Sequence, residues 1–238
     1  MKQTPNYIKG VVLFAILVLP SLLYLFLTAG KHNFVYLPIL ADEAQNYTAL
    51  VEENRREKPK HHYISDFRLN DEYSFKDLDD NIKLLFISRA DETLNSQLIA
   101  YMFETEVWAH LGNYEDIYFL NFVIEDSTHT FDASIFEENS IPKDQWINIP
   151  LSIDSLNSIM KDNVWVGEIA NKMHTGEELN IAEVIISDKE GRMRTGFDNN
   201  DIVMYSYNNL SKFEIKLLRD DLKVLLAEYQ RELKKKND

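Results

Sequence analysis

Histidine and methionine are the side chains of this chain that could hold a soft or borderline metal, because its 238 residues include no cysteine. The absence removes disulfide exchange, thiolate metal sites and cysteine nucleophiles together, since all three need a thiolate. The adjacent histidines, His61 and His62, would need further ligands to complete a tetrahedral site. The other histidines have no ligand spacing; they are His32, His110, His129 and His174. Adjacent side chains on a strand diverge, so surface histidines are the favoured interpretation.

The methionines are better explained as core residues than as thioether ligands. Met102, Met160 and Met173 fall at apolar positions of helical patterns, and methionine fills irregular core gaps well. A copper site built from His and Met remains an alternative.

The carboxylates and serines form no recognisable catalytic motif. Asp198-Asn-Asn-Asp201 lacks the spaced ligands, central Gly and terminal Glu of a calcium loop, and a polar turn is favoured. Glu104 and Glu106 lie two positions apart on a predicted helix and are expected on its solvated surface. Ser88 and Ser96 lack the Gly-x-Ser-x-Gly context of a nucleophile. A thiol-independent oxidoreductase is therefore only an alternative.

The charge balance excludes one class of partner. The formal net charge is −14, and residues 61–238 carry 18 basic and 34 acidic side chains, a balance of −16. Nucleic-acid binding needs a basic face, so we expect no nucleic-acid partner.

An uncharged apolar run occupies residues 10–30, between Lys9 and Lys31. At about 1.5 Å per residue it matches a hydrocarbon core of about 30 Å and predicts a transmembrane helix. Lys2 and Lys9 before the run favour a cytoplasmic N-terminus and a domain in the periplasm or extracytoplasmic space. A cleaved signal peptide is the alternative, with Thr28-Ala29-Gly30 as a weak cleavage site.

The predicted organisation has four parts. Residues 1–9 are a short cytoplasmic N-terminus, 10–30 the anchor of the cytoplasmic membrane, 31–60 a stalk and 61–238 the folded domain. Within the stalk, the apolar segment 32–40 is expected to pack back onto the domain, and 41–60 is dense in charge.

Within the domain, apolar runs alternate with helical patterns. Strands are expected at residues 63–69, 82–88, 117–124 and 182–187, the second and third as nearly continuous apolar runs of a sheet covered on both faces. A helix is predicted over 93–111, with Leu94, Leu98 and Met102 inward. Further helices are expected near Thr130 and from Ser152, the latter with Leu156, Ile159 and Met160 inward.

The last part of the chain has the clearest local signals. Asp188-Lys-Glu-Gly191 predicts a tight turn into residues 192–197. Ser211 and Glu214 have capping-box spacing, which places the start of a helix. Its apolar stripe is Ile215, Leu218, Leu222, Leu225 and Tyr229. The order βαβ followed by ββα predicts a thioredoxin-like α/β fold: a central mixed sheet flanked by helices.

The residues that carry this pattern resemble the Sco/SenC family of membrane-anchored thioredoxin-fold proteins. The similarity runs from about Phe34 to Glu228 and includes Leu37-Pro38, His62-Tyr-Ile-Ser-Asp-Phe67, Glu125-Asp126 and, most distinctively, Val184-Ile-Ile-Ser-Asp-Lys-Glu-Gly-Arg-Met-Arg194. The resemblance implies copper delivery and thiol reduction in the assembly of cytochrome oxidase.

The chain departs from that family at the residues that would do the chemistry. The resemblance places the family's Cys-x-x-x-Cys pair at Ala90 and Leu94 and its histidine near Asn180. None of these side chains can bind Cu(I), which selects soft ligands, and none can exchange with a disulfide. The chain is therefore predicted to be a degenerate member with no cofactor and no catalytic residue. We expect a protein-binding accessory or assembly factor, with Ala90, Leu94 and Asn180 as its docking patch.

Overall fold

The computed structural model describes residues 36–40, 63–132, 134, 139–164, 183–198, 204 and 206–237, together with Phe14, Ile16 and Val18. Residues 1–35 and 36–238 form two separate compact units, and the second contains the fold. Within the described residues, no helix has the length and apolar character of a membrane span. Most of the predicted span at 10–30 lies outside them.

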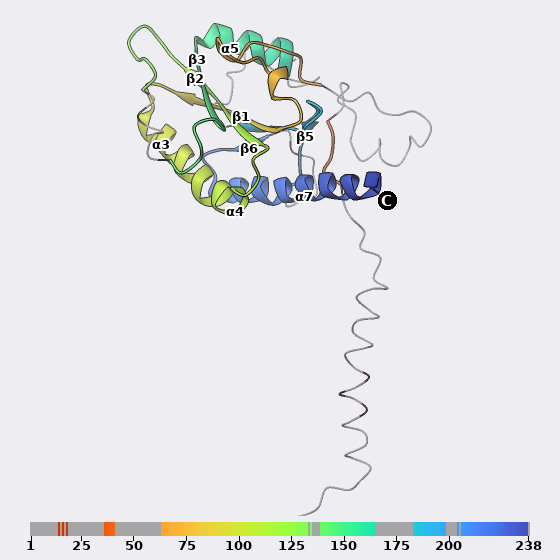
Figure 1. Ribbon diagram of the computed structural model, residues 1–238. Helices are drawn as coiled ribbons and strands as arrows, with labels where there is room; N and C mark the ends of the chain where they lie inside the picture. Colours follow the sequence, from red (N-terminus) through yellow and green to blue (C-terminus); the bar gives the residue numbers. More distant parts are fainter. Residues whose placement is uncertain are drawn as a thin grey trace, which may run out of the picture. The chain divides into compact units, whose positions relative to one another are not determined.

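A mixed six-stranded sheet forms the centre of the domain (Figure 1). Five strands lie in the order β3-β2-β1-β4-β5, and β6 pairs with β4 beside that path. β1 runs parallel to β2, and β2 parallel to β3, whereas β4 is antiparallel to β1, β5 and β6. The strand bounds are β1 Ile82–Arg89, β2 Ile117–Ile124, β3 Trp146–Leu151, β4 Glu183–Ser187, β5 Met193–Arg194 and β6 Tyr207–Asn208.

Helices cover both faces of this sheet, which confirms the predicted mixed sheet with flanking helices (Figure 1). α3 Thr93–Met102, the π-helix η2 Phe103–Trp108 and α4 Ala109–Leu111 form one continuous crossover between β1 and β2, and they share a face with α7 Lys212–Asn237. The other face carries α5 Ile153–Ile159 and the π-helix η4 Met160–Val164. The short 3-10 helix η1 spans Lys76–Leu78.

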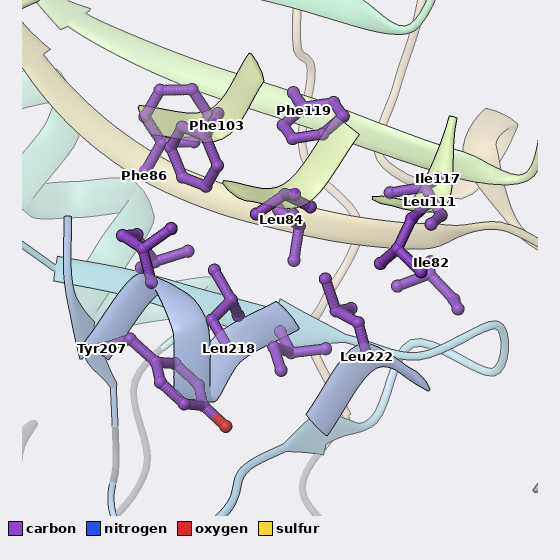
Figure 2. Close-up of a cluster of buried hydrophobic side chains, with 14 of the residues drawn as sticks. Ile82, Leu84, Phe86, Phe103, Leu111, Ile117, Phe119, Tyr207, Leu218 and Leu222 are labelled. Carbon is purple, nitrogen blue, oxygen red and sulfur yellow. The ribbon is translucent and has the colours of Figure 1, made fainter. Parts of the chain in front are cut away.

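The first core lies between the sheet and α7, and its apolar stripe is the one predicted from the sequence. The stripe residues Ile215, Leu218, Leu222 and Leu225 are each fully buried, in one cluster with Leu84 and its neighbours on β1 (Figure 2). Tyr229 is half-buried at the end of this stripe. An aromatic group completes the cluster, with Phe119 and Trp146 stacked at 5.4 Å between ring centroids.

The second core lies on the opposite face of the sheet. It joins Leu85 and Ile87 of β1 with Leu120 and Phe122 of β2, and Leu156 of α5 seals it. Leu156 and Met160 are buried, as predicted for the helix that starts at Ser152. The Ser152 hydroxyl accepts from the backbone N–H of Ser155 and caps that helix.

Two sequence predictions about the domain's elements are wrong. Residues 63–69 form no strand, because their backbone N–H groups donate to separate parts of the chain. Ile64 donates to the carbonyl of Gly191, Ser65 to that of Asn163 and Leu69 to that of Tyr73. The predicted inward face of the 93–111 helix is wrong at two of its positions, because Leu94 is 81% exposed and Leu98 44% exposed, whereas Met102 is buried as predicted.

The observed inward face of that helix keeps Met102 and has further apolar residues beside it. Ile99, Phe103 and Val107 are buried there. The π-helical turn η2 follows α3, and its wider turn changes the phase of the inward face along the crossover. Apolar residues therefore lie on both sides of α3.

Some elements depart from the prediction in other ways. β3 and β6 were not expected from the sequence, and the helix predicted near Thr130 falls partly outside the described residues. One of the two bonds of the predicted capping box forms. The Ser211 hydroxyl accepts from the N–H of Glu214, whereas the Glu214 carboxylate accepts from the N–H of Asn208 and not from that of Ser211.

Candidate functional site

The three parallel strands end at one edge of the sheet, at Arg89, Ile124 and Leu151. The carboxyl ends of strands are where open α/β sheets place their ligands. Ala90 follows β1 at this edge, is half-buried, and donates its N–H to the Ile124 carbonyl at 2.9 Å. We call this edge, with the loops that follow β1 and β2, the strand-end region.

The loop after β1 is held by its own polar side chains. Arg89 donates through Nε to Asp91 Oδ1 at 2.8 Å, which lowers the pKa of that carboxyl and raises the pKa of the guanidinium. Ser96 donates its hydroxyl to the Arg89 carbonyl at 3.2 Å. Glu92 lies at the N-cap position of α3 but makes no capping hydrogen bond with its side chain. Its carboxylate accepts from Asn95 instead.

The loop after β2 is likewise closed by its own carboxylates. Asp126 Oδ1 accepts from the N–H groups of Thr128 at 2.6 Å and His129 at 2.7 Å. The Thr128 hydroxyl also donates to Asp126 Oδ1, at 2.6 Å, and this bond, followed by the backbone bond of Thr128, holds the pKa of Asp126 well below its usual range. Glu125 accepts from the N–H of Phe131 at 2.6 Å. Asp126 and Glu125 therefore accept hydrogen bonds from the backbone of their own turn. Their role in this loop is structural.

A buried polar ladder fixes the strands just behind these loops. Ser88 donates to Asn121 at 2.8 Å, and Asn121 donates to Asn148 at 2.9 Å, so one chain of bonds crosses β1, β2 and β3. The indole N–H of Trp146 also donates to Asn148, at 3.0 Å. Ser88 therefore has a structural partner, in agreement with its lack of a nucleophile motif.

Of the three positions assigned to the predicted docking patch, the structure describes two. Ala90 and Leu94 lie in and just after the same loop, and Asn180 lies outside the described residues. Leu98 and Tyr101, at 44% and 60% exposure, follow Leu94 at i+4 and i+7 and therefore share its helix face. We call Leu94, Leu98 and Tyr101 the α3 stripe. Helical spacing alone predicts Leu94 and Leu98 in the core, whereas the predicted docking patch already placed Leu94 on the surface.

The segment of the chain that contains α3 is acidic in sequence. In the sequence from residue 84 to residue 142, Arg89 is the one basic residue, against eleven acidic ones. Glu106 was expected in solvent, but it is 8% exposed and pairs with Lys212 at 2.9 Å and Arg219 at 3.7 Å. That pairing lowers its pKa and ties η2 to the start of α7.

The candidate metal ligands do not converge within the described part of the chain. It contains no group of three or more His, Asp or Glu side chains placed to hold a metal. Met102, Met160 and Met193 are buried in the core, which confirms the core role predicted for the first two. Of the histidines, His110 and His129 are described and exposed, while Met173, His61 and His62 lie outside the described residues, as do most of residues 198–201.

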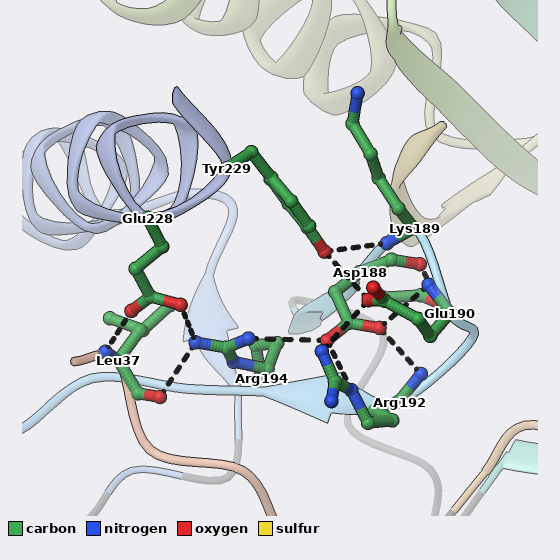
Figure 3. A network of polar contacts seen from close by, with 9 residues as sticks. Leu37, Asp188, Lys189, Glu190, Arg192, Arg194, Glu228 and Tyr229 are labelled. Atoms are coloured by element: carbon green, nitrogen blue, oxygen red, sulfur yellow. Dashed lines mark hydrogen bonds and ion pairs between the residues drawn. The ribbon is translucent and has the colours of Figure 1, made fainter. Parts of the chain in front are cut away.

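A second polar region lies on the turn between β4 and β5, and in contrast to the strand-end region it is buried. Asp188 is fully buried and accepts from Arg192 Nε at 2.7 Å and from Arg194 Nη1 at 3.2 Å (Figure 3). Its other oxygen accepts from the backbone N–H groups of Glu190 and Arg192 and shapes the turn. Gly191 has φ 77°, the left-handed conformation predicted for this position.

Arg194 links that turn to α7 and to the segment before the domain. It pairs with Glu228 of α7 and donates to the Leu37 carbonyl at 2.8 Å, and Glu228 in turn accepts from the N–H of Leu37 (Figure 3). Leu37 and Leu40 are buried, as expected of a segment that packs back onto the domain. We call the group Leu37, Asp188, Arg192, Arg194 and Glu228 the clamp.

Two further ionisable groups are buried away from both regions. The Asp221 carboxylate accepts from the Tyr207 hydroxyl at 2.7 Å, and burial raises the pKa of Asp221 to about 6. Lys83 is fully buried on β1, 3.5 Å from Asp79 and 4.7 Å from the Phe75 ring centroid. Burial lowers the pKa of Lys83. Neither group lies in an open site.

Comparisons with known proteins give structural relatives only. No family model and no curated protein matches the chain. A SCO1/SenC family lipoprotein from Bacillus anthracis str. Ames aligns with a TM-score of 0.48 at 14% identity, over 71% of this chain and 98% of that chain. BsSco, a member of the Sco family of cytochrome c oxidase assembly proteins, aligns with a TM-score of 0.45 at 14% identity, over 71% and 96%. The thioredoxin domain of a thiol-disulfide oxidoreductase from Bacteroides vulgatus gives 0.33 at 11%, over 63% and 86%.

Sco/SenC family proteins and a thiol-disulfide oxidoreductase are thus among the structural neighbours of the chain. The strand order and layers define the class of protein: a thioredoxin-like α/β domain, here with no cysteine in the chain.

Proposed function

We propose that this chain is a membrane-anchored, non-catalytic thioredoxin-like protein that works by binding another protein through the α3 stripe. The observation that supports this most is the exposure of Leu94, Leu98 and Tyr101 on one face of α3, at the edge where the fold otherwise presents its reactive group. A contiguous exposed apolar face marks a protein contact more often than chance exposure does.

The chemistry of the strand-end region supports a binding role over a catalytic one. The sequence offers no thiol, and the carboxylates of both loops accept hydrogen bonds from their own turns. At the strand ends, Asp91, Glu92 and Asp126 lie near Arg89, and this local excess of acidic groups suits a partner that presents apolar side chains with basic neighbours.

The process we propose is assembly of a respiratory oxidase outside the cytoplasmic membrane, with residues 10–30 as the anchor. Two sequence features support this assignment: the Sco/SenC-like stretch Val184–Arg194, and an uncharged run of bilayer length with Lys2 and Lys9 before it.

The test is the double variant Leu94→Glu/Leu98→Glu, expressed in cells deleted for the gene. Oxidase activity should fall to the level of the deletion, while the abundance of the variant stays that of the parent, because neither side chain belongs to the core. Ile153→Glu is the matched control, since Ile153 is 41% exposed on the other face of the sheet. Full oxidase activity in the double variant, or equal loss in the control, would reject the stripe as the docking site. Normal oxidase activity in the deletion would reject the oxidase assignment.

A further inference from the structure

The end of the α3 stripe at the start of α3 lies among acidic groups. Glu92 is the N-cap residue of α3, and Asp91 precedes it. Arg89 lies among these carboxylates, because its hydrogen bond to Asp91 raises its pKa most and the charges of Glu92 and Asp126 act in the same direction. His129, which pairs with Asp126, adds a positive charge only when it is protonated. Three carboxylates against one guanidinium make this end of the stripe acidic.

The other end of the stripe, at Tyr101, lies among basic groups. Lys212 of α7 pairs with Glu106 at 2.9 Å. Glu106 raises the pKa of Lys212, with a smaller contribution from Tyr101, so Lys212 lies near the end of the stripe. The hydrogen bond from Lys212 in turn lowers the pKa of Glu106, and the charges of Lys216 and Arg219 act in the same direction. Three cations therefore surround one carboxylate here.

One more carboxylate lies on the same helical segment. Glu104 follows Tyr101 by three positions and accepts from both the hydroxyl and the backbone N–H of Ser140. Counted together with Glu106, it leaves the Tyr101 end with three cations against two carboxylates. The α3 stripe therefore runs from an acidic end to a basic end.

A stripe with this charge pattern is complementary to a second copy of itself. Leu94 and Tyr101 are seven residues apart, which is about 10 Å along a helix, and Leu98 lies near the middle. When two such helices pack antiparallel about a two-fold axis, Leu94 of each copy faces Tyr101 of the other, and Leu98 faces its own counterpart. The acidic end of each stripe then faces the basic end of the other.

We propose that the partner of the α3 stripe is a second copy of this chain, paired antiparallel through Leu94, Leu98 and Tyr101. The inference rests on the stripe as the protein-binding face of the proposed function, and it names the molecule that this face binds. A parallel pair would bring like charges together, which disfavours it. Because the same patch is used by both copies, the pair is closed and the association stops at two.

Single introduced cysteines test the pairing, because the chain has no cysteine of its own. Full-length Leu98→Cys is oxidised in detergent, and the yield of disulfide-linked dimer is measured. Ile153→Cys is the matched control, since Ile153 is also an exposed apolar residue but belongs to α5 on the other face of the sheet. The yield should be roughly tenfold higher at position 98, because a disulfide needs the two Cβ atoms within about 4.5 Å of each other. Equal yields at the two positions overturn the inference.

A mixture of two variants determines the direction of the pair. Leu94→Cys and Tyr101→Cys are carried on chains with tags of different mass, so that mixed and self-linked dimers separate. The mixed 94–101 dimer should form, whereas Leu94→Cys should link to itself no more than the control does, because the two Leu94 positions lie about 10 Å apart along the paired helices. Self-linking of Leu94→Cys without the mixed product would mean a parallel pair and overturns the inference.

Charge reversal tests the two ends of the stripe. In the Leu98→Cys background, Glu92→Lys should lower the dimer yield roughly threefold, as expected for exposed ion pairs, and adding Lys216→Glu should restore it. Lys216 is chosen because Lys212 pairs with Glu106 of its own chain. High salt should also lower the yield, since exposed charges are screened over about 10 Å at 0.1 M. A yield that neither Glu92→Lys nor salt changes contradicts pairing directed by charge.

Failure of this inference and failure of the proposed function give different results. If Leu94→Glu/Leu98→Glu abolishes oxidase activity but Leu98→Cys links no more than the control, the stripe binds a different protein and the second copy alone is rejected. If Leu98→Cys links as expected and the double glutamate variant keeps full oxidase activity, the second copy is supported and the oxidase role is rejected.

Discussion

The clamp and the strand-end region use polar residues in opposite ways. In the clamp, Asp188, Arg194 and Glu228 are almost wholly buried and pair across three parts of the chain. In the strand-end region, Arg89, Asp91 and Asp126 are partly exposed and pair within a few residues of themselves. Removing one member of a buried set leaves an uncompensated charge, whereas an exposed pair contributes little. The stability of the domain therefore depends more on the clamp than on the ion pairs of the strand-end region.

The largest expected effect comes from breaking the clamp. Arg194→Met removes the cation between two buried carboxylates and should cost about 3–5 kcal/mol in the free energy of unfolding, measured in urea. Arg89→Met in the strand-end region is the matched control and should cost about 1 kcal/mol or less, because Arg89 and Asp91 are each 31% exposed. Adding Glu228→Leu to Arg194→Met should recover part of the loss. Equal losses for the two arginines would contradict the division between buried and exposed pairs.

The next effect concerns the core beneath α7. Leu222→Ala should cost about 2–5 kcal/mol, because it opens a cavity at a fully buried position. Leu98→Ala on the α3 stripe should change the unfolding free energy by only about 0.5 kcal/mol. A loss within experimental noise at Leu222 would mean that the stripe of α7 faces solvent.

A smaller effect depends on pH. Burial raises the pKa of Asp221 to about 6 in the folded state, above its ordinary value of 3.8. The folded state therefore binds this proton more tightly, and the stability it contributes is lost as pH rises through about 6. Asp221→Asn should remove about 1–2 kcal/mol of the pH dependence between pH 4 and 8, since partial exposure reduces the full linkage value. Asp220→Asn, at a side chain 56% exposed, is the control. The same pH profile in Asp221→Asn and the parent would contradict the assignment.

The parts of the fold that were predictable are those with local signals. β1, β2 and β4 are apolar runs, and α7 combines a capping serine with a regular apolar stripe. β3 was missed because Asn148 and Pro150 interrupt its apolar pattern, although an edge strand tolerates a proline. Residues 63–69 alternate like a strand but bond to three separate partners.

The candidate regions were less predictable than the fold. Apolar residues occupy both faces of α3, so hydrophobic spacing alone could not distinguish the core face from the exposed one. The clamp joins Leu37, Arg194 and Glu228, which are distant in the sequence, and no local pattern could pair them. What the sequence did indicate was the turn at Gly191 and the absence of thiols at the strand-end loop.

The central claim is that the strand-end region does not bind Cu(I). A Cu(I) titration of the full chain, in competition with a chelator, tests this claim most directly. The parent should show no stoichiometric submicromolar binding, because Met102, Met160 and Met193 are buried and the chain has no thiol. The variant Ala90→Cys/Leu94→Cys/Asn180→His should gain such binding if the family positions are assigned correctly. Stoichiometric, submicromolar Cu(I) binding by the parent would contradict the account and favour a site built from histidine and methionine.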